Sequence, residues 1–228
     1  MFRDALCDLR FNFFLAKHYM KQKYNQKTII IIVSLIIVLI LTTYFLTSCT
    51  KEYMGKKETS EKLNKTLLFF ITLLNNNNIE NWFVCYGTLL GLVRENSCID
   101  NDDDIDIIIE KSNYDTIKKL LIDNNFKLTF DHGINESKNI IKTTATSDYA
   151  SLDIYMGDFG STNVFDMWNK LNIKDCFFDI ENKTFIKKSW KGQNINYPNN
   201  YKRILINRYG NDWNIKKDVK IPQTMKEL

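Results

Sequence analysis

A stretch in which aspartate alternates with isoleucine constrains the fold more than any other part of the sequence. It begins at Asp104 and reads Asp-Ile-Asp-Ile-Ile-Ile-Glu. In a β-strand, side chains two positions apart point to the same face. The sequence therefore predicts a strand on which Asp104 and Asp106 project together, while Ile105, Ile107 and Ile109 project the other way, into a core.

Two carboxylates side by side on one strand face repel each other, so this arrangement needs a compensating cation. Mg²⁺ prefers oxygen ligands and is typically held by one or two carboxylates together with substrate phosphates. We therefore expect Asp104 and Asp106 to be metal ligands and catalytic residues of a phosphate enzyme, with Mg²⁺ as the cofactor and Mn²⁺ as an alternative. The metal would neutralise charge on the leaving phosphate.

The residues just before this strand are also acidic. Asp102 is a candidate auxiliary residue, whereas Asp103 faces away if the strand extends that far. A solvated loop without function is the alternative interpretation of Asp100–Asp103. A calcium-binding loop of the EF-hand type is not indicated, because its glycine and its final glutamate are missing.

Two other places along the chain fit the same chemistry. Gly87 and Thr88 lie between an expected strand and the start of a short helix, where free N–H groups favour an anion and a small residue lets a phosphate approach. Asp153 lies in a second alternating strand, Ser151 to Tyr155. It is a candidate third carboxylate, either as a metal ligand or as a general base on an acceptor hydroxyl.

The order of the expected elements predicts an α+β domain with a small mixed β-sheet flanked by helices. Helices are expected over residues 61–75, 89–94, 113–124 and 199–209. Ser112 is the expected N-cap of the helix over 113–124. Strands are expected over residues 82–86, 104–110, 126–131, 138–144 and 150–156. The segment between the last strand and the last helix is irregular and rich in aromatic residues, Asn and Lys.

Residues 28–47 contain no charged residue. A helix of about 20 apolar residues spans the hydrocarbon core of a bilayer, so this run predicts one transmembrane helix. A buried core helix, a cleaved signal peptide and a bacterial lipoprotein processing site ending at Cys49 are alternatives. The segments expected are a basic cytoplasmic tail over 1–27, the membrane helix over 28–47, a stem over 48–60, a catalytic domain over 61–220 and a tail over 221–228.

The distribution of charge limits the expected partners and location. The net charge is +4, and residues 1–27 hold six basic and two acidic residues, so the rest of the chain carries no net charge. A nucleic-acid partner is therefore not expected. The basic flank weakly places the N-terminus in the cytoplasm and the catalytic domain in a lumen or outside the cell. There, Asn64, Asn135 and Asn182 would be glycosylation acceptors.

The cysteines do not predict a metal site. Five cysteines stand far apart, with no C-x-x-C pair. A structural zinc site usually shows ligands paired at short spacing, so zinc is not expected. A disulfide among Cys85, Cys98 and Cys176 is left open.

Two ordered motifs resemble the LicD family, which includes bacterial phosphorylcholine transferases, fukutin and fukutin-related protein. The first is Gly-Thr-Leu-Leu-Gly-Leu-Val-Arg from Gly87, followed by Asp-Asp-Asp-Ile-Asp from Asp102. The second is Arg-Tyr-Gly-Asn-Asp-Trp from Arg208, which is similar to the closing element of the family. The similarity spans roughly residues 62–215. A Pro-Trp pair that usually precedes the family's aspartates is replaced here by Asp100-Asn101.

The resemblance implies a nucleotidyltransferase-like fold. It also implies transfer of a phosphorylated alcohol, of the phosphocholine or phosphopolyol type, from a CDP-linked donor to a glycan acceptor. Asp104 and Asp106 match the metal-binding aspartates of the motif. The positions matched to substrate contacts are Gly87, Thr88, Arg94 and Asp102. A structural salt bridge from Arg94 to the acidic loop is an equal alternative, and the closing turn is expected to pack rather than react.

Two other functions stay open at this point. The same carboxylates would serve literal nucleotidyl transfer, in which a nucleoside monophosphate moves to a small acceptor and pyrophosphate is released. A non-catalytic, glycan-binding membrane protein that keeps only the fold is the other alternative, and the intact aspartates count against it.

Overall fold

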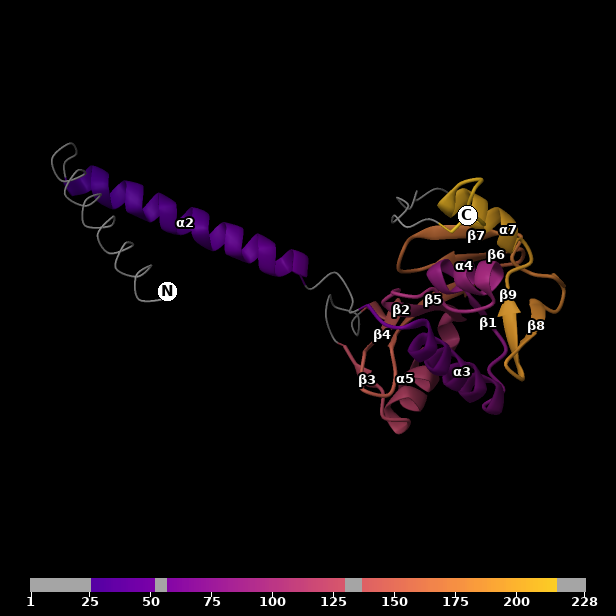
Figure 1. Ribbon diagram of the computed structural model, residues 1–228. Coiled ribbons are helices and arrows are strands. Elements are labelled where there is room, and N and C mark those ends of the chain that lie inside the picture. Colours follow the sequence, from indigo (N-terminus) through magenta and orange to yellow (C-terminus); the bar gives the residue numbers. More distant parts are fainter. Residues whose placement is uncertain (1–25, 52–56, 130–136, 217–228) are drawn as a thin grey trace. The chain divides into compact units, whose positions relative to one another are not determined.

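The computed structural model of the chain describes residues 26–51, 57–129 and 137–216 (Figure 1). The chain forms two compact units, Met1–Met54 and Gly55–Leu228. The tail expected over 221–228, nearly all of the basic tail over 1–27, part of the stem over 48–60 and the sequon at Asn135 lie outside the described residues.

The described part of the first unit is one helix, α2 (Gln26–Lys51), which contains the uncharged run at 28–47. No helix in the described ranges combines the length and the apolar character needed to cross a membrane. The transmembrane helix expected at residues 28–47 is therefore not found.

The second unit is built on a seven-stranded mixed sheet, as the sequence predicted for the catalytic domain. Its main path runs in the order β1-β2-β5-β4-β3, and β6 and β7 extend from β5. Only β2 and β5 pair in parallel, and the other pairs are antiparallel. The strands are β1 (Trp82–Val84), β2 (Asp104–Glu110), β3 (Lys127–Leu128), β4 (Ile140–Thr144), β5 (Ser151–Phe159), β6 (Asn163–Asp166) and β7 (Leu171–Lys174). A separate hairpin consists of β8 (Ile186–Trp190) and β9 (Gln193–Tyr197).

Helices cover both faces of this sheet. They are α3 (Ser60–Asn76), α4 (Tyr86–Glu95), α5 (Tyr114–Asp123) and α7 (Tyr201–Tyr209), and a 3₁₀ turn, η1 (Lys111–Asn113), precedes α5. In Figure 1, α4 and α7 lie on one side of β2 and β5, and α3 and α5 lie on the other. Apolar residues of α3 recur every three or four positions and are buried, which is why this helix packs on the sheet.

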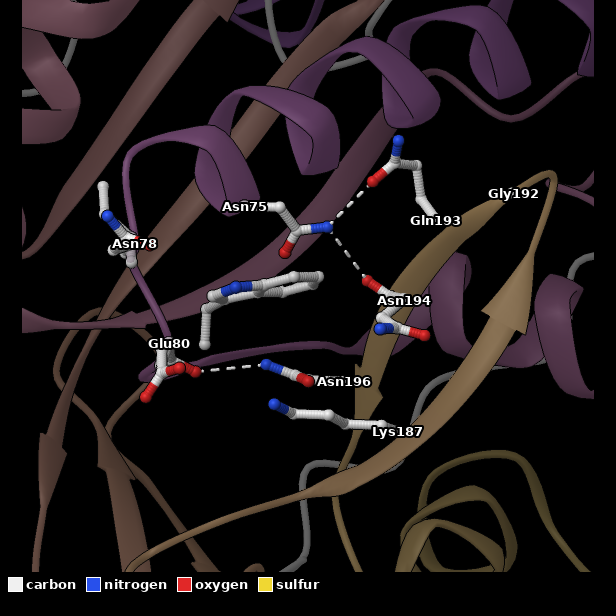
Figure 2. Close-up of a pocket in the computed structure, with 10 residues that line it drawn as sticks. Asn75, Asn78, Glu80, Lys187, Gly192, Gln193, Asn194 and Asn196 are labelled. Atoms are coloured by element: carbon white, nitrogen blue, oxygen red, sulfur yellow. Dashed lines mark hydrogen bonds between the residues drawn. The ribbon is translucent and has the colours of Figure 1, made fainter.

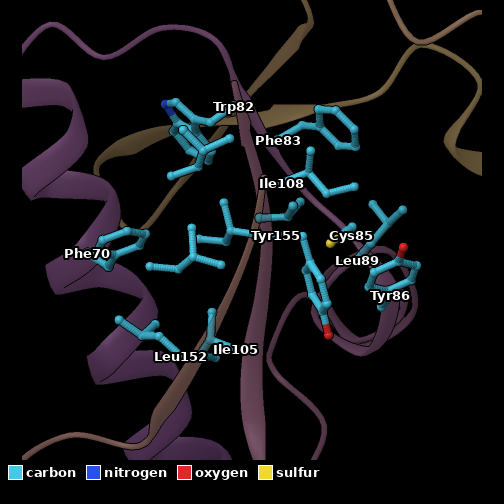
Figure 3. Close-up of a cluster of buried hydrophobic side chains, with 14 of the residues drawn as sticks. Phe70, Trp82, Phe83, Cys85, Tyr86, Leu89, Ile105, Ile108, Leu152 and Tyr155 are labelled. Carbon is cyan, nitrogen blue, oxygen red and sulfur yellow. The ribbon is translucent and has the colours of Figure 1, made fainter. Parts of the chain in front are cut away.

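The central strand β2 is buried on both faces over most of its length. Ile105, Ile107 and Ile109 are fully buried, as expected, and so is Ile108 on the opposite face. Figure 3 shows Phe70 of α3 on one side of the strands and Leu89 of α4 on the other. On the α4 face of β2, the two aspartates lie at the start of the strand and are followed by the buried Ile108.

Two details differ from the sequence predictions, and one question that the sequence left open, the disulfide, is answered. The start of the third helix is not capped by Ser112, which lies inside η1, and the N-cap Asn113 makes no side-chain capping bond. The irregular segment after β5 holds four short strands, β6 to β9. Positive φ angles in their connections fall at Lys170, Asp175, Lys183, Lys191 and Gly192. Three of these residues are lysines, which are not typical of such turns, and this hid the strands. Cys85, Cys98 and Cys176 are buried free thiols, so no disulfide joins them.

The sequon at Asn64 is not available as a glycosylation acceptor in the folded domain. Asn64 is only 8% exposed. Its side chain donates to the Ser97 hydroxyl at 2.8 Å and accepts from the Cys98 N–H at 2.9 Å. A glycan on the Asn64 amide nitrogen would have no room while this side chain keeps its buried position. Asn182, by contrast, lies on an exposed turn, where its side chain donates to Asp179.

Candidate active site

The parallel pairing of β2 with β5 brings two of the expected carboxylates together. Asp106 stands directly opposite Asp153 in the strand register. On the other side of β5, Lys142 of β4 stands opposite Asp153. Residues in register share a face, so these three side chains project from adjacent strands on the face that α4 covers. The Lys142 ammonium forms an ion pair with the Asp153 carboxylate.

The acidic loop before β2 is fixed in place by the residues that lead into α3. The Glu58 N–H donates to the Asp102 carbonyl at 2.8 Å, and the Asn101 N–H donates to the Glu58 carbonyl at 3.0 Å. Oxygens of Asp102, Asp103 and Asp104 lie within 4.8 Å of one another. Asp103, expected to face away, thus joins this group, because the residue precedes the regular strand.

The start of α4 approaches this acidic group from above the sheet. The Gly87 N–H donates to Asp106 Oδ2 at 2.9 Å, and the Asp106 N–H donates to the Thr88 hydroxyl at 2.9 Å. A Cβ on Gly87 would lie 2.7 Å from Asp102 Oδ2 and 3.2 Å from Asp106 Oδ2. Glycine is therefore needed here so that two carboxylates can fit over the helix start. The positive end of the helix stabilises their charge.

The carboxylates of this site are held in an unfavourable electrostatic state. Burial is the main cause that raises the pKa of Asp106 to about 7, and the charges of Asp102 and Asp153 raise it further, against the opposing effect of Arg208. Burial and the neighbouring aspartates also raise the pKa of Asp104 well above its usual value. Burial raises the pKa of Asp153 as well, although Lys142 opposes it. A divalent cation bound to these oxygens would relieve this repulsion.

Buried tyrosine hydroxyls and their partners orient Asp106 and the start of α4. The Tyr155 hydroxyl donates to Asp106 Oδ1 at 3.1 Å. The Tyr86 hydroxyl donates to Asp166, which is fully buried and also accepts the N–H groups of Trp168 and Asn169. Both oxygens of Asp106 are thus held by donors, and each keeps a lone pair for a further ligand.

Arg208 brings a buried positive charge to the same region. Its guanidinium lies 4.0 Å from the centre of the Tyr86 ring, and the residue is 7% exposed. Its effect on the pKa of Asp106 shows that its charge reaches the acidic group. The match of this chain segment to the closing turn of the family drew attention to Tyr209, Gly210 and Trp213, but it gave no role to Arg208.

Arg94 is not directed at the acidic loop. Its Nε donates to the carboxylate of the adjacent Glu95 at 2.9 Å. The salt bridge expected from Arg94 to the acidic loop is therefore not observed, and Arg94 pairs with Glu95 instead. Its expected contact with a substrate phosphate stays a prediction, as do the contacts expected of Gly87, Thr88 and Asp102.

Two site residues, Lys142 and Tyr155, were missed by sequence reasoning. Both lie in strands that were expected, and Tyr155 occupies a position between the buried apolar residues Ile154 and Met156. Alternation placed Tyr155 on the same face as Asp153, and it could have identified this tyrosine. Lys142 could not be found in this way, because its pairing depends on the register between β4 and β5.

A pocket of the domain lies away from this site (Figure 2). It has a volume of about 320 Å³ and lies between the end of α3, β1 and the β8–β9 hairpin. In Figure 2, Asn75 reaches from α3 to Gln193 and Asn194, and Asn196 reaches to Glu80. None of the aspartates of the acidic group lines it. We place the reactive site at the acidic group, because titratable groups with perturbed pKa values converge there.

Comparison with known proteins agrees with this geometry. The family model described as LicD/FKTN/FKRP, nucleotidyltransferase domain, matches residues 78–209, more than half of the chain. The chain belongs to the LicD family. The match runs from just before β1 to the end of α7, so the acidic group, Lys142, Asp153 and Arg208 all lie inside it.

Among solved structures, one that is similar is the crystal structure of the lincosamide antibiotic adenylyltransferase LnuA with lincomycin bound. It shares 15% sequence identity with this chain, covering 62% of this chain and 83% of its own, with a TM-score of 0.45. No sequence among the curated proteins matches. Family membership indicates a transferase of the phosphotransferase or nucleotidyltransferase type, and it gives no reason to expect a nucleic-acid partner.

Proposed function

We propose that this LicD-family protein transfers a phosphorylated alcohol, of the phosphocholine or phosphopolyol type, from a CDP-linked donor to a glycan. The observation that carries the proposal is the convergence of Asp106, Asp153 and the Asp102–Asp104 loop on one end of the β2–β5 pair. Family membership supplies the reaction class, and the donor and acceptor are those that the motif resemblance implies.

The donor set fits a hard divalent cation. All the candidate ligands are carboxylate oxygens, which hard divalent cations prefer. Burial and neighbouring aspartates raise the pKa of Asp104 and of Asp106, and a bound cation would offset this effect. Asp104 and Asp106 would hold Mg²⁺, or Mn²⁺, with Asp102 and Asp103 close enough to assist. The cation would supply charge neutralisation at the donor diphosphate.

The residues of the chain provide the other steps. Gly87 N–H and the Tyr155 hydroxyl hold Asp106 in one orientation, and each carboxylate oxygen keeps a lone pair for a cation. Asp153 is the general base in this proposal, because its raised pKa favours acceptance of a proton from the acceptor hydroxyl. Transfer forms a bond from that hydroxyl oxygen to the phosphorus next to the alcohol and releases CMP.

The experiment is a screen of CDP-choline, CDP-ribitol and CDP-glycerol with glycan acceptors, in which release of CMP is followed with and without Mg²⁺. We expect one donor to give Mg²⁺-dependent CMP release that falls at least about 100-fold in Asp104→Asn and in Asp106→Asn. The exposed Asp158, at the other end of β5, provides the control Asp158→Asn. Transfer that survives intact in both site variants would exclude the proposal.

The description of the matched domain as a nucleotidyltransferase domain favours one second candidate. In literal nucleotidyl transfer the same carboxylates act, but a nucleoside triphosphate is the donor and pyrophosphate is the product. Measurement of which product accumulates, CMP or pyrophosphate, separates the two functions.

A further inference from the structure

Lys142 has a place in the candidate active site that no motif indicates. It lies on β4, two strands away from β2, and its ammonium pairs with Asp153 across the β4–β5 register. The Asp153 side chain is 8% exposed, whereas that of Lys142 is 29% exposed. The lysine therefore lies between the buried carboxylates and the solvent from which a substrate must enter.

The charge of Lys142 interacts with more than its direct partner. Burial lowers the pKa of Lys142, but the charges of Asp153, Asp104 and Asp106 outweigh this effect and raise it. Its ammonium is thus within electrostatic reach of the whole carboxylate group. In the protein without a bound cation, Lys142 supplies part of the positive charge that this group needs.

A lysine in this position has a second partner available. Lysine carries a compact charge on a flexible stem of four carbons, and it binds phosphate as a point charge. When the oxygens of Asp153 turn to a divalent cation or to an acceptor hydroxyl, the attraction that holds Lys142 weakens. Its ammonium is then free to move by a stem rotation toward a phosphate group bound at the same site.

We propose that Lys142 is a diphosphate-binding residue of the donor site, which Asp153 holds in place until cation and donor bind. This inference rests on the proposed function, since it assumes a donor that carries a diphosphate. It adds a binding residue for that group and a sequence of contacts, first with Asp153 and then with phosphate.

The rival interpretation is that Lys142 only neutralises Asp153 and never contacts a substrate. Both interpretations predict that removal of the lysine charge strengthens the binding of a cation alone, because a competing positive charge is lost. They differ for a diphosphate, whose binding weakens only if Lys142 contacts it. General damage to the fold would weaken both kinds of binding.

The test uses the full chain and its Lys142→Met variant with two probes. Mn²⁺ alone is titrated by electron paramagnetic resonance, and inorganic pyrophosphate is titrated by calorimetry at saturating Mg²⁺. We expect Lys142→Met to bind Mn²⁺ several-fold more tightly and pyrophosphate about tenfold more weakly, the loss expected for one hydrogen bond to a charged group. Lys142→Arg, which keeps the charge, should retain most of the pyrophosphate binding.

Lys111→Met is the matched control. Lys111 pairs with Asp158 of the same strand β5 at 2.9 Å, but both side chains are about half exposed and lie at the other end of the strand. This variant should change neither dissociation constant. Unchanged pyrophosphate binding in Lys142→Met, or weaker binding of both probes, would overturn the inference. Lysine-dependent pyrophosphate binding without any release of CMP from CDP-linked donors would uphold it and reject the donor proposed above.

Discussion

Gly87 and Gly91 lie one turn apart in α4. Replacement of Gly87 by alanine should lower the transfer activity, whereas replacement of Gly91 should lower the stability of the fold. At Gly87 a Cβ would lie 2.7 Å from Asp102 Oδ2, the end of a side chain that can turn away. At Gly91 a Cβ would lie 2.5 Å from the Ser97 carbonyl oxygen, which is backbone. The first substitution thus displaces a carboxylate of the site, whereas the second displaces the chain.

The expected magnitudes follow from these contacts. In Gly87→Ala, Asp102 must move by about 0.5 Å or more, a displacement comparable to the tolerance of a preorganised site, and misplacement by about 1 Å can cost roughly 100-fold in rate. We therefore expect a 10- to 100-fold loss of transfer activity with a nearly unchanged Tm. In Gly91→Ala, overpacking should cost about 1–3 kcal/mol, and each kcal/mol lowers Tm by about 2–4 °C at this chain length.

The assay is thermal unfolding by circular dichroism, combined with Mg²⁺-dependent CMP release for both variants. The pair forms its own control, because both positions are in one helix and receive the same methyl group. If Gly87→Ala retains full activity, Gly87 is not needed to make room for the two carboxylates. If it lowers Tm as much as Gly91→Ala does, its effect lies in the fold rather than in the site.

Two further predictions concern the charge and the packing around the site. In chelator-treated protein, the pKa of Asp106 is about 7 in the folded state and near 4 in the unfolded state. The folded state therefore binds more protons between these pH values. Because of this, the free energy of unfolding should fall as pH rises from about 4 to 7. Urea unfolding measured at several pH values should show this fall in stability. The fall should be smaller in Asp106→Asn or with excess Mg²⁺. A free energy of unfolding that rises over this pH range would contradict the burial of charge described here. Asp166→Ala should lower the free energy of unfolding by about 3 kcal/mol or more, because it leaves the Tyr86 hydroxyl and the N–H groups of Trp168 and Asn169 without their acceptor. A loss below about 1 kcal/mol in urea unfolding would show that water replaces the carboxylate.

Short-range patterns predicted the parts of the fold that depend on them. The alternation around Asp104 and Asp106 gave strand β2 and its buried isoleucines, and the helical spacing of apolar residues gave α3. The strand expected over 82–86 is longer than β1, which ends at Val84. The observed strand is shorter because Tyr86 already belongs to α4. Its φ of 47° starts that helix in a conformation that sequence pattern does not reveal.

The candidate site could be predicted only where its residues follow a local pattern. Asp104 and Asp106 alternate along one strand, so their common face could be inferred, whereas the place of Asp153 beside Asp106 depends on the register between β2 and β5. The partners of these residues come from long-range register and packing, as with Lys142 on β4 and Arg208 on α7. At Gly87 the structure adds two features that no pattern indicated: its N–H donates to Asp106, and its missing side chain leaves room for Asp102.

The central claim is that Asp104 and Asp106 bind a divalent cation. The most direct measurement is the number and affinity of Mn²⁺ ions bound by the wild-type chain, Asp104→Asn, Asp106→Asn and the control Asp158→Asn, determined by electron paramagnetic resonance. We predict at least one Mn²⁺ ion that the wild-type chain and Asp158→Asn bind equally and that both site variants bind at least about tenfold more weakly. Equal binding by all four proteins, or no binding by the wild-type chain, would contradict the claim.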